Sequence, residues 1–350
     1  MKVLLTGHKG YIGSVAAAVL HTAGHEVVGL DSDLFAGCDF GQPPFAIPEI
    51  VKDIRDLAEG DLEGFNAVVH LAALSNDPLG NLDPSITYDI NHHASMRLAR
   101  LAKQAGVCRF VFSSSCSTYG AAGEAIHEEN APLSPVTAYA KSKVLVERDL
   151  NGMADEYFSP TFLRNATAYG ISPRLRLDVV LNDLVAWAYT TGRVYIKSDG
   201  TPWRPIVHIR DIVAAIVSVL EAPREAVHNE TFNVGQTKEN YRIRELANIV
   251  KEVVPGCRLE YAPDGGPDKR CYRVNCDRIR SVLPNFHPQW DARKGAEELY
   301  QAYRTTGLTS FDLQSGRYMR ITRIRELMRT ERLDASLRWM RRPVEAAVVA

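Results

Sequence analysis

The sequence predicts an α/β protein in which a Rossmann-type, doubly wound parallel sheet is joined to a smaller, interleaved α/β lobe. Short apolar runs alternate with helical segments over the first 170 residues. This alternation favours a right-handed parallel sheet covered on both faces. A glycine-rich turn, TGHKGYIG at residues 6–13, lies between the first apolar run and the first helical segment. The 45% hydrophobic content is that of a globular chain with a substantial core.

The expected elements follow one another in strand–helix order. Strands are predicted where short apolar runs end at turn residues, over residues 2–5, 26–30, 67–71, 109–112 and 161–163. Helices are predicted over residues 11–23, 87–105 and 138–157. After Gly170 the pattern changes: residues 178–191 and 212–220 are expected to be helical, and the loops SDGTPWRP and APDGGPDK indicate a second lobe.

Charge and cysteine usage exclude several classes of protein. The formal net charge is −1, so the molecule as a whole is not built to bind polyanions, and no nucleic-acid partner is expected. The six cysteines form no C-x-x-C pair and no zinc-ligand pattern, which favours reduced thiols and no metal site. The apolar N-terminus is broken by glycines and is too short to span a bilayer, so we expect a cytoplasmic protein without a membrane partner.

The glycine turn has the spacing of a dinucleotide-binding site. Gly7 allows the tight turn, Gly10 lets the backbone approach a pyrophosphate, and Gly13 allows close helix–strand packing. A purely structural turn is the alternative if the motif is taken alone. Asp31 ends the next strand, where its carboxylate would accept hydrogen bonds from a ribose and repel a 2′-phosphate. The pattern therefore favours NAD over NADP, although Lys9 inside the turn favours NADP.

A Tyr-x-x-x-Lys pair downstream of this turn predicts acid/base chemistry on an alcohol. Tyr139 and Lys143 lie one helical turn apart in AYAKSKVLVE. A free tyrosine has a pKa near 10, and lowering it by about three units requires about 4 kcal/mol. Lys143 and a positively charged nicotinamide ring could together supply that stabilisation. The alternative is a surface pair at helical spacing.

Together these motifs resemble the extended short-chain dehydrogenase/reductase family, the nucleotide-sugar epimerases and dehydratases, over roughly residues 1–300. The resemblance implies an NAD cofactor, a nucleotide-diphosphate sugar substrate and a homodimer formed through the helices expected at 87–105 and 138–157. It implies an NAD-binding domain over residues 1–170 with returning segments near 206–236. A substrate lobe over 171–310 and a basic helical tail over 311–350 complete the expected organisation.

The resemblance also implies specific cofactor contacts. Asp53 and Ile54 match an adenine-binding pair, the segment after His70 matches an alanine-rich turn beside the cofactor, and His70 itself is expected to be a core histidine. The implied cofactor-binding residues are Gly7, Gly10, Tyr11, Ile12, Gly13, Asp31, Asp53, Ile54, Leu71, Ala72, Ala73, Asn91, Ser113, Tyr139 and Lys143.

The segment VFSSSCSTYG is expected to supply the third catalytic residue, Ser115, beside Tyr139 and Lys143. Dehydratases of the family carry an Asp-Glu pair at the next two positions, where this chain has Cys116 and Ser117. Without those carboxylates an elimination lacks its acid and base, so dehydration is disfavoured. Cys116 is expected to be packed, and a role in proton transfer stays open.

The resemblance places substrate contacts in the second lobe. Asn182 matches an asparagine that approaches the phosphates, and Arg204 matches an arginine that clamps the pyrophosphate, which suits a bidentate guanidinium. The family's second arginine position appears here as Gly265, with Arg270 nearby, so the sugar and the base stay open. The implied substrate-binding residues are Ser115, Cys116, Ser117, Thr167, Asn182, Arg204 and Arg270.

The arginine-rich tail has apolar residues at helical spacing. Ile321, Ile324, Leu327 and Met328 predict an amphipathic helix that docks on the body or on a second subunit. A nucleic-acid arm is the alternative, disfavoured because surface aromatics and an overall basic balance are missing.

These observations favour an NAD-dependent nucleotide-sugar epimerase that acts at C4 through a transient 4-keto sugar. A nucleotide-sugar 4-dehydrogenase or ketoreductase would use the same residues and differ in releasing the cofactor. A non-catalytic NAD-sensing or RNA-binding protein on the same fold is the alternative of another class. The presence of both Tyr139 and Lys143 disfavours that alternative.

Overall fold

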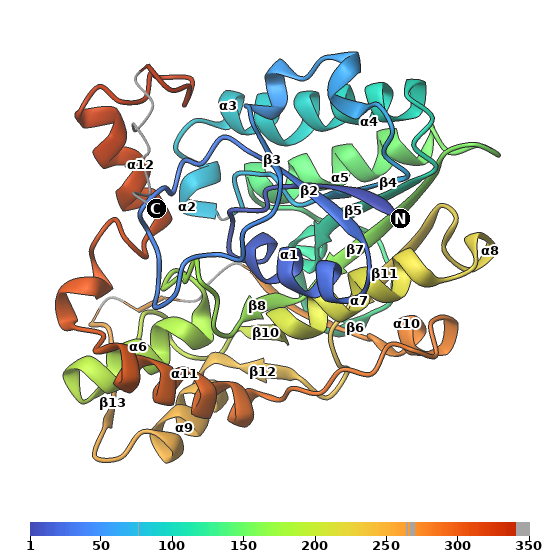
Figure 1. The fold of residues 1–350 in the computed structure, drawn as a ribbon. Coiled ribbons are helices and arrows are strands. Elements are labelled where there is room, and N and C mark those ends of the chain that lie inside the picture. The colour runs from blue at the N-terminus through green and yellow to red at the C-terminus, as the bar shows by residue number, and fades with distance from the viewer. Residues whose placement is uncertain (76, 264, 267–269, 341–350) are drawn as a thin grey trace.

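A seven-stranded parallel sheet forms the centre of the molecule, and the predicted fold class is confirmed (Figure 1). The computed structural model describes residues 1–75, 77–263, 265–266 and 270–340. The strand order is β11-β7-β5-β4-β1-β2-β3, and every pairing is parallel. The strands are β1 (Lys2–Thr6), β2 (Glu26–Asp31), β3 (Glu49–Val51), β4 (Ala67–His70), β5 (Arg109–Ser115), β7 (Ser159–Asn165) and β11 (Glu230–Val234).

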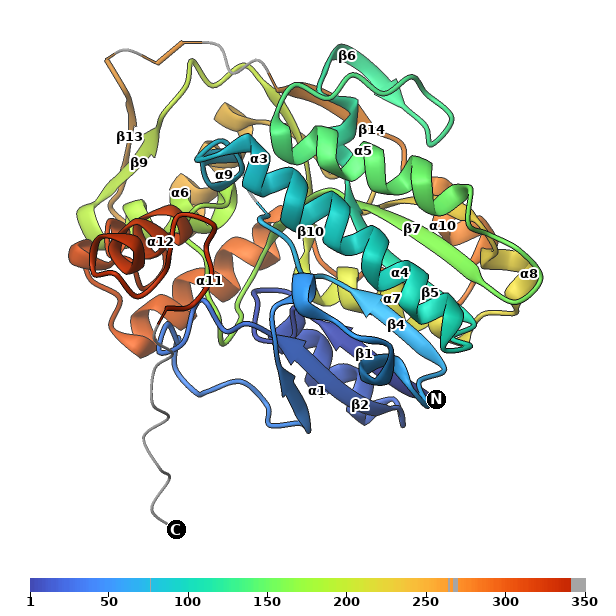
Figure 2. The same ribbon diagram turned by 90° about the horizontal axis from the view of Figure 1, so that it is seen from above.

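Helices cover both faces of this sheet (Figure 2). One face packs against α4 (Ala94–Gln104) and α5 (Ala138–Asn151), and the other packs against α1 (Gly13–Thr22) and α7 (Ile209–Glu221). Side chains alternate along each strand, so Leu4 belongs to the first core cluster while Val3 and Leu5 belong to the second. Burial of both faces explains why these strands are almost uniformly apolar.

Smaller sheets and a third core cluster lie beside the large sheet. A three-stranded sheet has the order β12 (Asn240–Arg242), β10 (Trp203–His208), β8 (Thr167–Tyr169). Two-stranded sheets pair β13 (Arg258–Tyr261) with β9 (Arg193–Ile196), and β14 (Cys271–Val274) with β6 (Ala121–His127). The helices here are α6 (Val180–Thr191), α9 (Ile243–Val253) and α11 (Ala292–Thr306).

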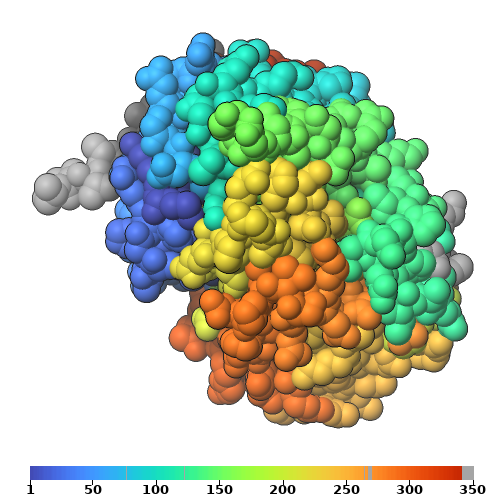
Figure 3. All heavy atoms as spheres, turned by 90° about the vertical axis from the view of Figure 1, so that its right-hand side faces the viewer, coloured from blue at the N-terminus to red at the C-terminus, as the bar shows by residue number. Residues whose placement is uncertain are grey.

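Segments distant in sequence interleave in this region. Figure 3 shows yellow and orange segments of the second half lying against green segments of the first. Strand β6, from the first half of the chain, likewise pairs with β14 from the second half. The proposed division into domains stays a prediction. Short helices complete the chain: α2 (Asp77–Gly80), α3 (Pro84–Tyr88), α8 (Arg224–Val227) and α10 (Asp277–Val282).

The helix expected over residues 87–105 is not continuous. It begins earlier as α3, where the Asp83 side chain accepts a hydrogen bond from the Ser85 backbone N–H at 2.8 Å. A π-helical turn over Asp89–His93 then separates α3 from α4. The first helix begins at Gly13 rather than at residue 11, because the preceding residues form the glycine turn. The short strand β3 was not among the strands predicted from apolar runs, but it lies just before the Asp53-Ile54 pair, where the family resemblance implied a third strand.

The C-terminal segment returns to the large sheet as α12 (Arg320–Arg329), which lies beside α2 (Figure 1). Ile324 and Leu327 are buried in the core cluster that also contains α4 and α5, and Ile321 and Met328 pack against it. The amphipathic pattern therefore docks the helix on the body of its own chain. The end of the predicted tail, residues 341–350, lies outside the described residues. Within the described part of the chain, no helix is long and apolar enough to cross a membrane.

Candidate functional site

A cavity of about 790 Å³ opens at the carboxyl ends of the central strands. It lies where the strand order reverses, between β1 and β4, which is where open α/β sheets bind ligands. Of the expected cofactor contacts, those lining it are Gly7, Gly10, Tyr11, Ile12, Gly13, Asp31, Asp53, Ile54, Leu71, Ala72, Ala73, Ser113, Tyr139 and Lys143. Of the expected substrate contacts, those lining it are Ser115, Ser117, Thr167, Arg204 and Arg270.

The glycine turn is as tight as the motif requires. Gly7 has a φ of +75°, and the Gly10 N–H donates to the Gly7 carbonyl at 2.9 Å. A Cβ at Gly13 would lie 2.0 Å from the Gly7 oxygen, and a Cβ at Gly7 would lie 2.7 Å from the Ala72 nitrogen. Only glycine fits this cradle, which leaves backbone exposed at the start of α1, as a dinucleotide phosphate requires.

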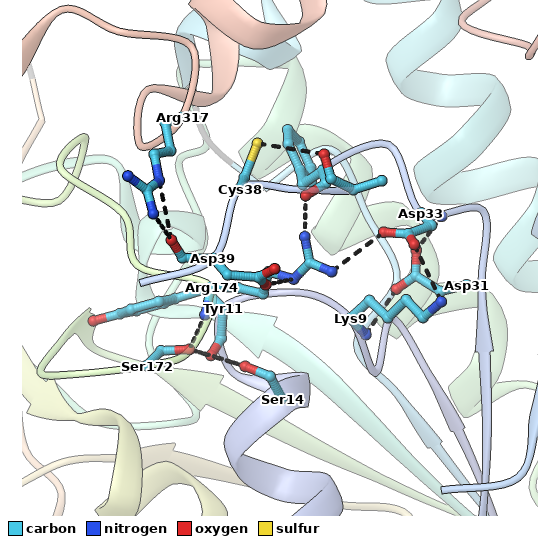
Figure 4. Close-up of polar contacts among 12 residues, drawn as sticks. Lys9, Tyr11, Ser14, Asp31, Asp33, Cys38, Asp39, Ser172, Arg174 and Arg317 are labelled. Carbon is cyan, nitrogen blue, oxygen red and sulfur yellow. Dashed lines mark hydrogen bonds and ion pairs between the residues drawn. The ribbon is translucent and has the colours of Figure 1, made fainter. Parts of the chain in front are cut away.

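Hydrogen bonds tie this turn to the loop after β8 (Figure 4). The Tyr11 hydroxyl donates to the Gly170 carbonyl at 2.6 Å. The Ser172 hydroxyl donates to the Tyr11 carbonyl at 2.7 Å and lies 2.9 Å from the Ser14 hydroxyl. The loop after β8 thus holds the glycine turn and the start of α1 in place.

Asp31 and Lys9 have different tasks. The Asp31 carboxylate, at the end of β2, accepts from the backbone N–H groups of Lys9 (3.0 Å) and Asp33 (2.8 Å). Burial raises the pKa of Asp31. The Lys9 ammonium is held by Asp33 at 3.1 Å and Glu49 at 2.9 Å. Lys9 therefore serves the local structure, and its presence in the turn is not an argument for a 2′-phosphate.

The three expected catalytic side chains meet between the end of β5 and the start of α5. Thr137 caps α5 by accepting from the Ala140 N–H at 3.2 Å, which places Tyr139 in the first turn. The Ser115 hydroxyl lies close enough to the Tyr139 hydroxyl to oppose the rise in the pKa of the phenol. The Lys143 ammonium lies 5.7 Å from the centre of the Tyr139 ring and donates to a β5 backbone carbonyl, that of Ser113, at 2.7 Å.

Burial sets the proton affinities of this pair. It raises the pKa of Tyr139 to about 12, against the opposing effects of the Ser115 hydrogen bond and the nearby Arg176. It lowers the pKa of Lys143 to about 7, against the opposing charge of Glu147. In the protein without its cofactor, burial outweighs these attractive interactions, because it removes the phenolate from water. That Lys143 and a nicotinamide ring together lower the pKa of Tyr139 stays a prediction.

Two asparagines expected at ligands hold the backbone instead. Asn91 accepts from the Leu74 N–H at 2.8 Å and donates to the Ser142 hydroxyl at 3.1 Å, so it joins the loop after β4 to α5. Asn182 accepts from the Gly170 N–H at 3.0 Å and donates to the Tyr11 hydroxyl at 3.0 Å. Neither is among the described residues that line the cavity. We therefore assign both to positioning and not to ligand contact.

Cys116 is also turned away from the cavity. It is fully buried and donates to the Arg164 carbonyl at 3.1 Å. It packs with Tyr119, Tyr272 and Cys276, and burial raises the pKa of its thiol. The packed cysteine was the expected outcome, and we remove Cys116 from the substrate contacts.

His70 is a core histidine, as expected. Its ring nitrogens lie 2.7 Å from the hydroxyls of Thr6 and Ser95, and burial lowers its pKa to about 3. The ring at the end of β4 is therefore neutral, and both of its nitrogens have hydrogen-bond partners.

Basic side chains that were not predicted from the sequence lie between β8 and α6. Arg176 lines the cavity, donates to Asp178 at 2.7 Å and reaches the Ser75 hydroxyl at 3.0 Å. Neighbouring Arg174 is 3.2 Å from Asp39 and 3.6 Å from Asp33 (Figure 4). The run PRLRLD directly after the turn at Gly170 was the available signal.

Two further arginines line the same cavity. Arg204, on β10, donates to the Trp203 carbonyl at 2.8 Å and lies 5.8 Å from the centre of the Tyr272 ring. Arg270 pairs with Asp77 of α2, so the ion pair joins the loop after β4 to the substrate side. Both arginines line the cavity.

Comparison with known proteins gives one family. The model of the NAD dependent epimerase/dehydratase family matches residues 3–235. The chain is similar to the UDP-glucose 4-epimerase of Corynebacterium glutamicum, with 32% identity over 319 residues, 86% of this chain and 95% of that protein. It is 30% identical to the UDP-glucose 4-epimerase of Mycolicibacterium smegmatis, over 87% of this chain and 99% of that protein.

Solved structures agree with these relatives. The structure of MoeE5 in complex with UDP-glucuronic acid and NAD is 28% identical to this chain, with a TM-score of 0.76. The match covers 87% of this chain and 100% of that chain. UDP-glucuronic acid 4-epimerase from Bacillus cereus, at 22% identity with a TM-score of 0.74, shares the fold over 87% of this chain and 99% of that chain.

Proposed function

The chain belongs to the NAD-dependent epimerase/dehydratase family, and we propose that it is a nucleotide-sugar epimerase that inverts C4 through a transient 4-keto sugar. NAD is the cofactor, as the sequence predicted. The observation that carries the proposal is the meeting of Tyr139, Ser115 and Lys143 in the same cavity as the glycine turn.

Each catalytic side chain has a separate task. Tyr139 takes the proton from the O4 hydroxyl and later returns it. Ser115, which favours the charged form of the phenol, hydrogen-bonds the same sugar hydroxyl. Lys143 stabilises the phenolate when it is protonated, and a pKa near 7 makes protonation accessible at neutral pH. When bound, NAD supplies the hydride acceptor and a positive charge beside the phenol.

Inversion requires the sugar to present both faces to the same residues. Arg204 and Arg270 line the same cavity, and their guanidinium groups can hold a diphosphate while the sugar turns. Thr167 and Ser117 also line this cavity. The names of the sequence relatives favour a uridine diphosphate hexose as the substrate.

A panel of nucleotide sugars tests the proposal. Purified protein without added NAD is incubated with each sugar, and NMR reports inversion at each carbon while absorbance reports reduced nicotinamide. Inversion at C4 without net reduction supports the epimerase. Net formation of NADH would instead assign the chain as a 4-dehydrogenase, and a Tyr139→Phe variant that retains every activity would favour a non-catalytic role.

A further inference from the structure

We propose that the C-terminal strap, residues 310–340, is part of the cofactor site and that Arg320 binds a phosphate oxygen of the dinucleotide. The inference rests on NAD use by the proposed enzyme and is independent of which sugar is turned over. Met319, Arg320 and Leu337 of the strap line the cavity together with the glycine turn. The strap is therefore a wall of the site.

The far end of the strap is tied to the rim where the adenosine is expected. The Trp339 indole N–H donates to the Ser32 carbonyl at 2.6 Å, one residue after Asp31. Arg55 donates to the Ser336 carbonyl at 2.8 Å, and the same guanidinium pairs with the Asp53 carboxylate at 2.7 Å. The strap thus holds the two loops that carry the expected ribose and adenine contacts.

Further contacts fix the strap at both ends. Arg338 pairs with Asp56 at 2.7 Å. Near the start of the strap, Arg317 donates to the Asp39 carbonyl at 2.7 Å (Figure 4). Between these points Ile324 and Leu327 are buried in the core. The strap is docked along its described length, and opening this side of the cavity requires it to undock.

Arg320 brings an unsatisfied donor into this wall. Its side chain is 4% exposed, its guanidinium lies 3.9 Å from the centre of the Phe35 ring, and Nη2 donates to the Arg174 carbonyl at 3.0 Å. Nη1 is buried and has no hydrogen-bond partner among the residues that the structure describes. A buried cation without a partner is costly, so an anion that completes the site is expected.

The surrounding charges favour a phosphate. Arg174 and Arg176 lie nearby and are each paired with carboxylates, at Asp39 and Asp178 respectively. Arg320 has no such pair in the described part of the chain. Phosphate oxygens match guanidinium geometry, and the pyrophosphate of a dinucleotide carries the required charge. The glycine turn on the same cavity is the expected seat of that pyrophosphate.

Variants of Arg320 test the phosphate contact. Arg320→Gln, Arg320→Lys and, as a matched control on the exposed face of the same helix, Arg325→Gln are compared with the parent protein. Affinity for NAD and for UDP is measured separately by titration calorimetry on cofactor-stripped protein, without any sugar. We expect Arg320→Gln to weaken NAD binding about tenfold or more, Arg320→Lys to weaken it less, and Arg325→Gln to leave it unchanged.

The outcomes separate the sources of phosphate and the effects on folding. Because Arg320→Gln also removes the Nη2 bond to the Arg174 carbonyl and the packing on Phe35, the melting temperature of each stripped variant is measured beside its affinity. Unchanged NAD affinity in Arg320→Gln overturns the contact. A loss of UDP affinity with NAD affinity intact would assign Arg320 to the substrate, which also overturns it. If Arg320→Gln lowers the melting temperature, the affinities of Arg320→Lys are used in its place. Equal losses of NAD affinity and of UDP affinity in Arg320→Lys would overturn the contact.

Undocking the strap tests retention of the cofactor. Trp339→Ala removes the bond to Ser32, whereas Met340→Ala changes an exposed neighbouring side chain. We expect Trp339→Ala to speed dissociation of NAD about tenfold, with Met340→Ala unchanged, in a chase with excess unlabelled cofactor. Equal rates in both variants would overturn the retention role. Faster release would support it even if no sugar were epimerised, which separates this inference from the proposed function.

Discussion

Tyr139 shows how burial and catalysis oppose each other at one side chain. The cavity that excludes water from the phenol raises its pKa to about 12, and the same burial lowers that of Lys143 to about 7. The motif predicted which residues would meet, and the structure brings them together at the end of β5. The motif could not predict the direction in which the pKa of Tyr139 is shifted, because that direction depends on how deeply the tertiary fold encloses the ring.

Removing the phenolic oxygen tests the proton relay. We expect Tyr139→Phe to lower kcat for C4 inversion by at least about 10²-fold, because general acid–base catalysis contributes about that much. The ring remains to fill its site, so the melting temperature should change little. A steady-state assay with thermal denaturation of the same sample checks both. A variant with near-parental kcat would remove Tyr139 from the mechanism.

The buried Lys143 gives a pH-dependent stability. Its folded-state pKa lies near 7 while an unfolded lysine titrates near 10.4, so between these values the unfolded chain binds more protons. Below about pH 7 the buried lysine is protonated in both states, and its full desolvation cost lowers the free energy of unfolding. Above that value the free energy of unfolding rises with pH.

Chemical denaturation of cofactor-stripped protein checks this titration. From about pH 7 to about pH 9 the parent protein should gain about 1–3 kcal/mol relative to Lys143→Met, since one pKa unit equals about 1.4 kcal/mol. Lys141→Met, at an exposed position of the same helix, should follow the parent. A constant difference between parent and Lys143→Met would contradict the lowered pKa.

At the scale of elements, local motifs were predictable and partners from other elements were not. The glycine turn, the strand ends and the amphipathic α12 follow from spacing in one segment. The role of Asn182 depends on Tyr11, which is 171 residues away in sequence. Asn91 likewise depends on a loop and a helix that only the fold brings together. The break at Asp89–His93 left no periodicity signal, because the residues around it are compatible with a continuous helix.

A substitution in the turn tests the tightness of the cradle. A Cβ at Gly13 would lie 2.0 Å from the Gly7 oxygen, so Gly13→Ala must displace backbone. We expect a loss of about 1–3 kcal/mol in stability and the loss of co-purifying NAD. Gly152→Ala, where the nearest atom is 3.6 Å away and φ is negative, is the control. Normal NAD content in Gly13→Ala, measured after denaturation, would contradict a dinucleotide seat at this turn.

For the whole molecule, we propose a homodimer formed through α4 and α5. These helices contact each other on the outer face of the sheet (Figure 2). Val144 and Leu145 are partly exposed on α5. Apolar side chains on such a face suit an isologous contact between two copies.

Light scattering checks the assembly. The parent protein should have the mass of a dimer, and Leu145→Glu should give a monomer because it would bury like charges opposite each other. Arg148→Glu, at an exposed position of the same helix, is a control for added negative charge. A monomeric parent would refute the dimer.

We propose that hydride leaves C4 of a nucleotide sugar and returns to the same carbon beside Tyr139. The most direct measurement uses UDP-glucose labelled with deuterium at C4, incubated with the purified protein in ordinary water without added NAD. We expect UDP-galactose that retains its deuterium at C4, with no net reduced nicotinamide. Protium from solvent at C4, or a keto sugar accumulating with NADH, would contradict it.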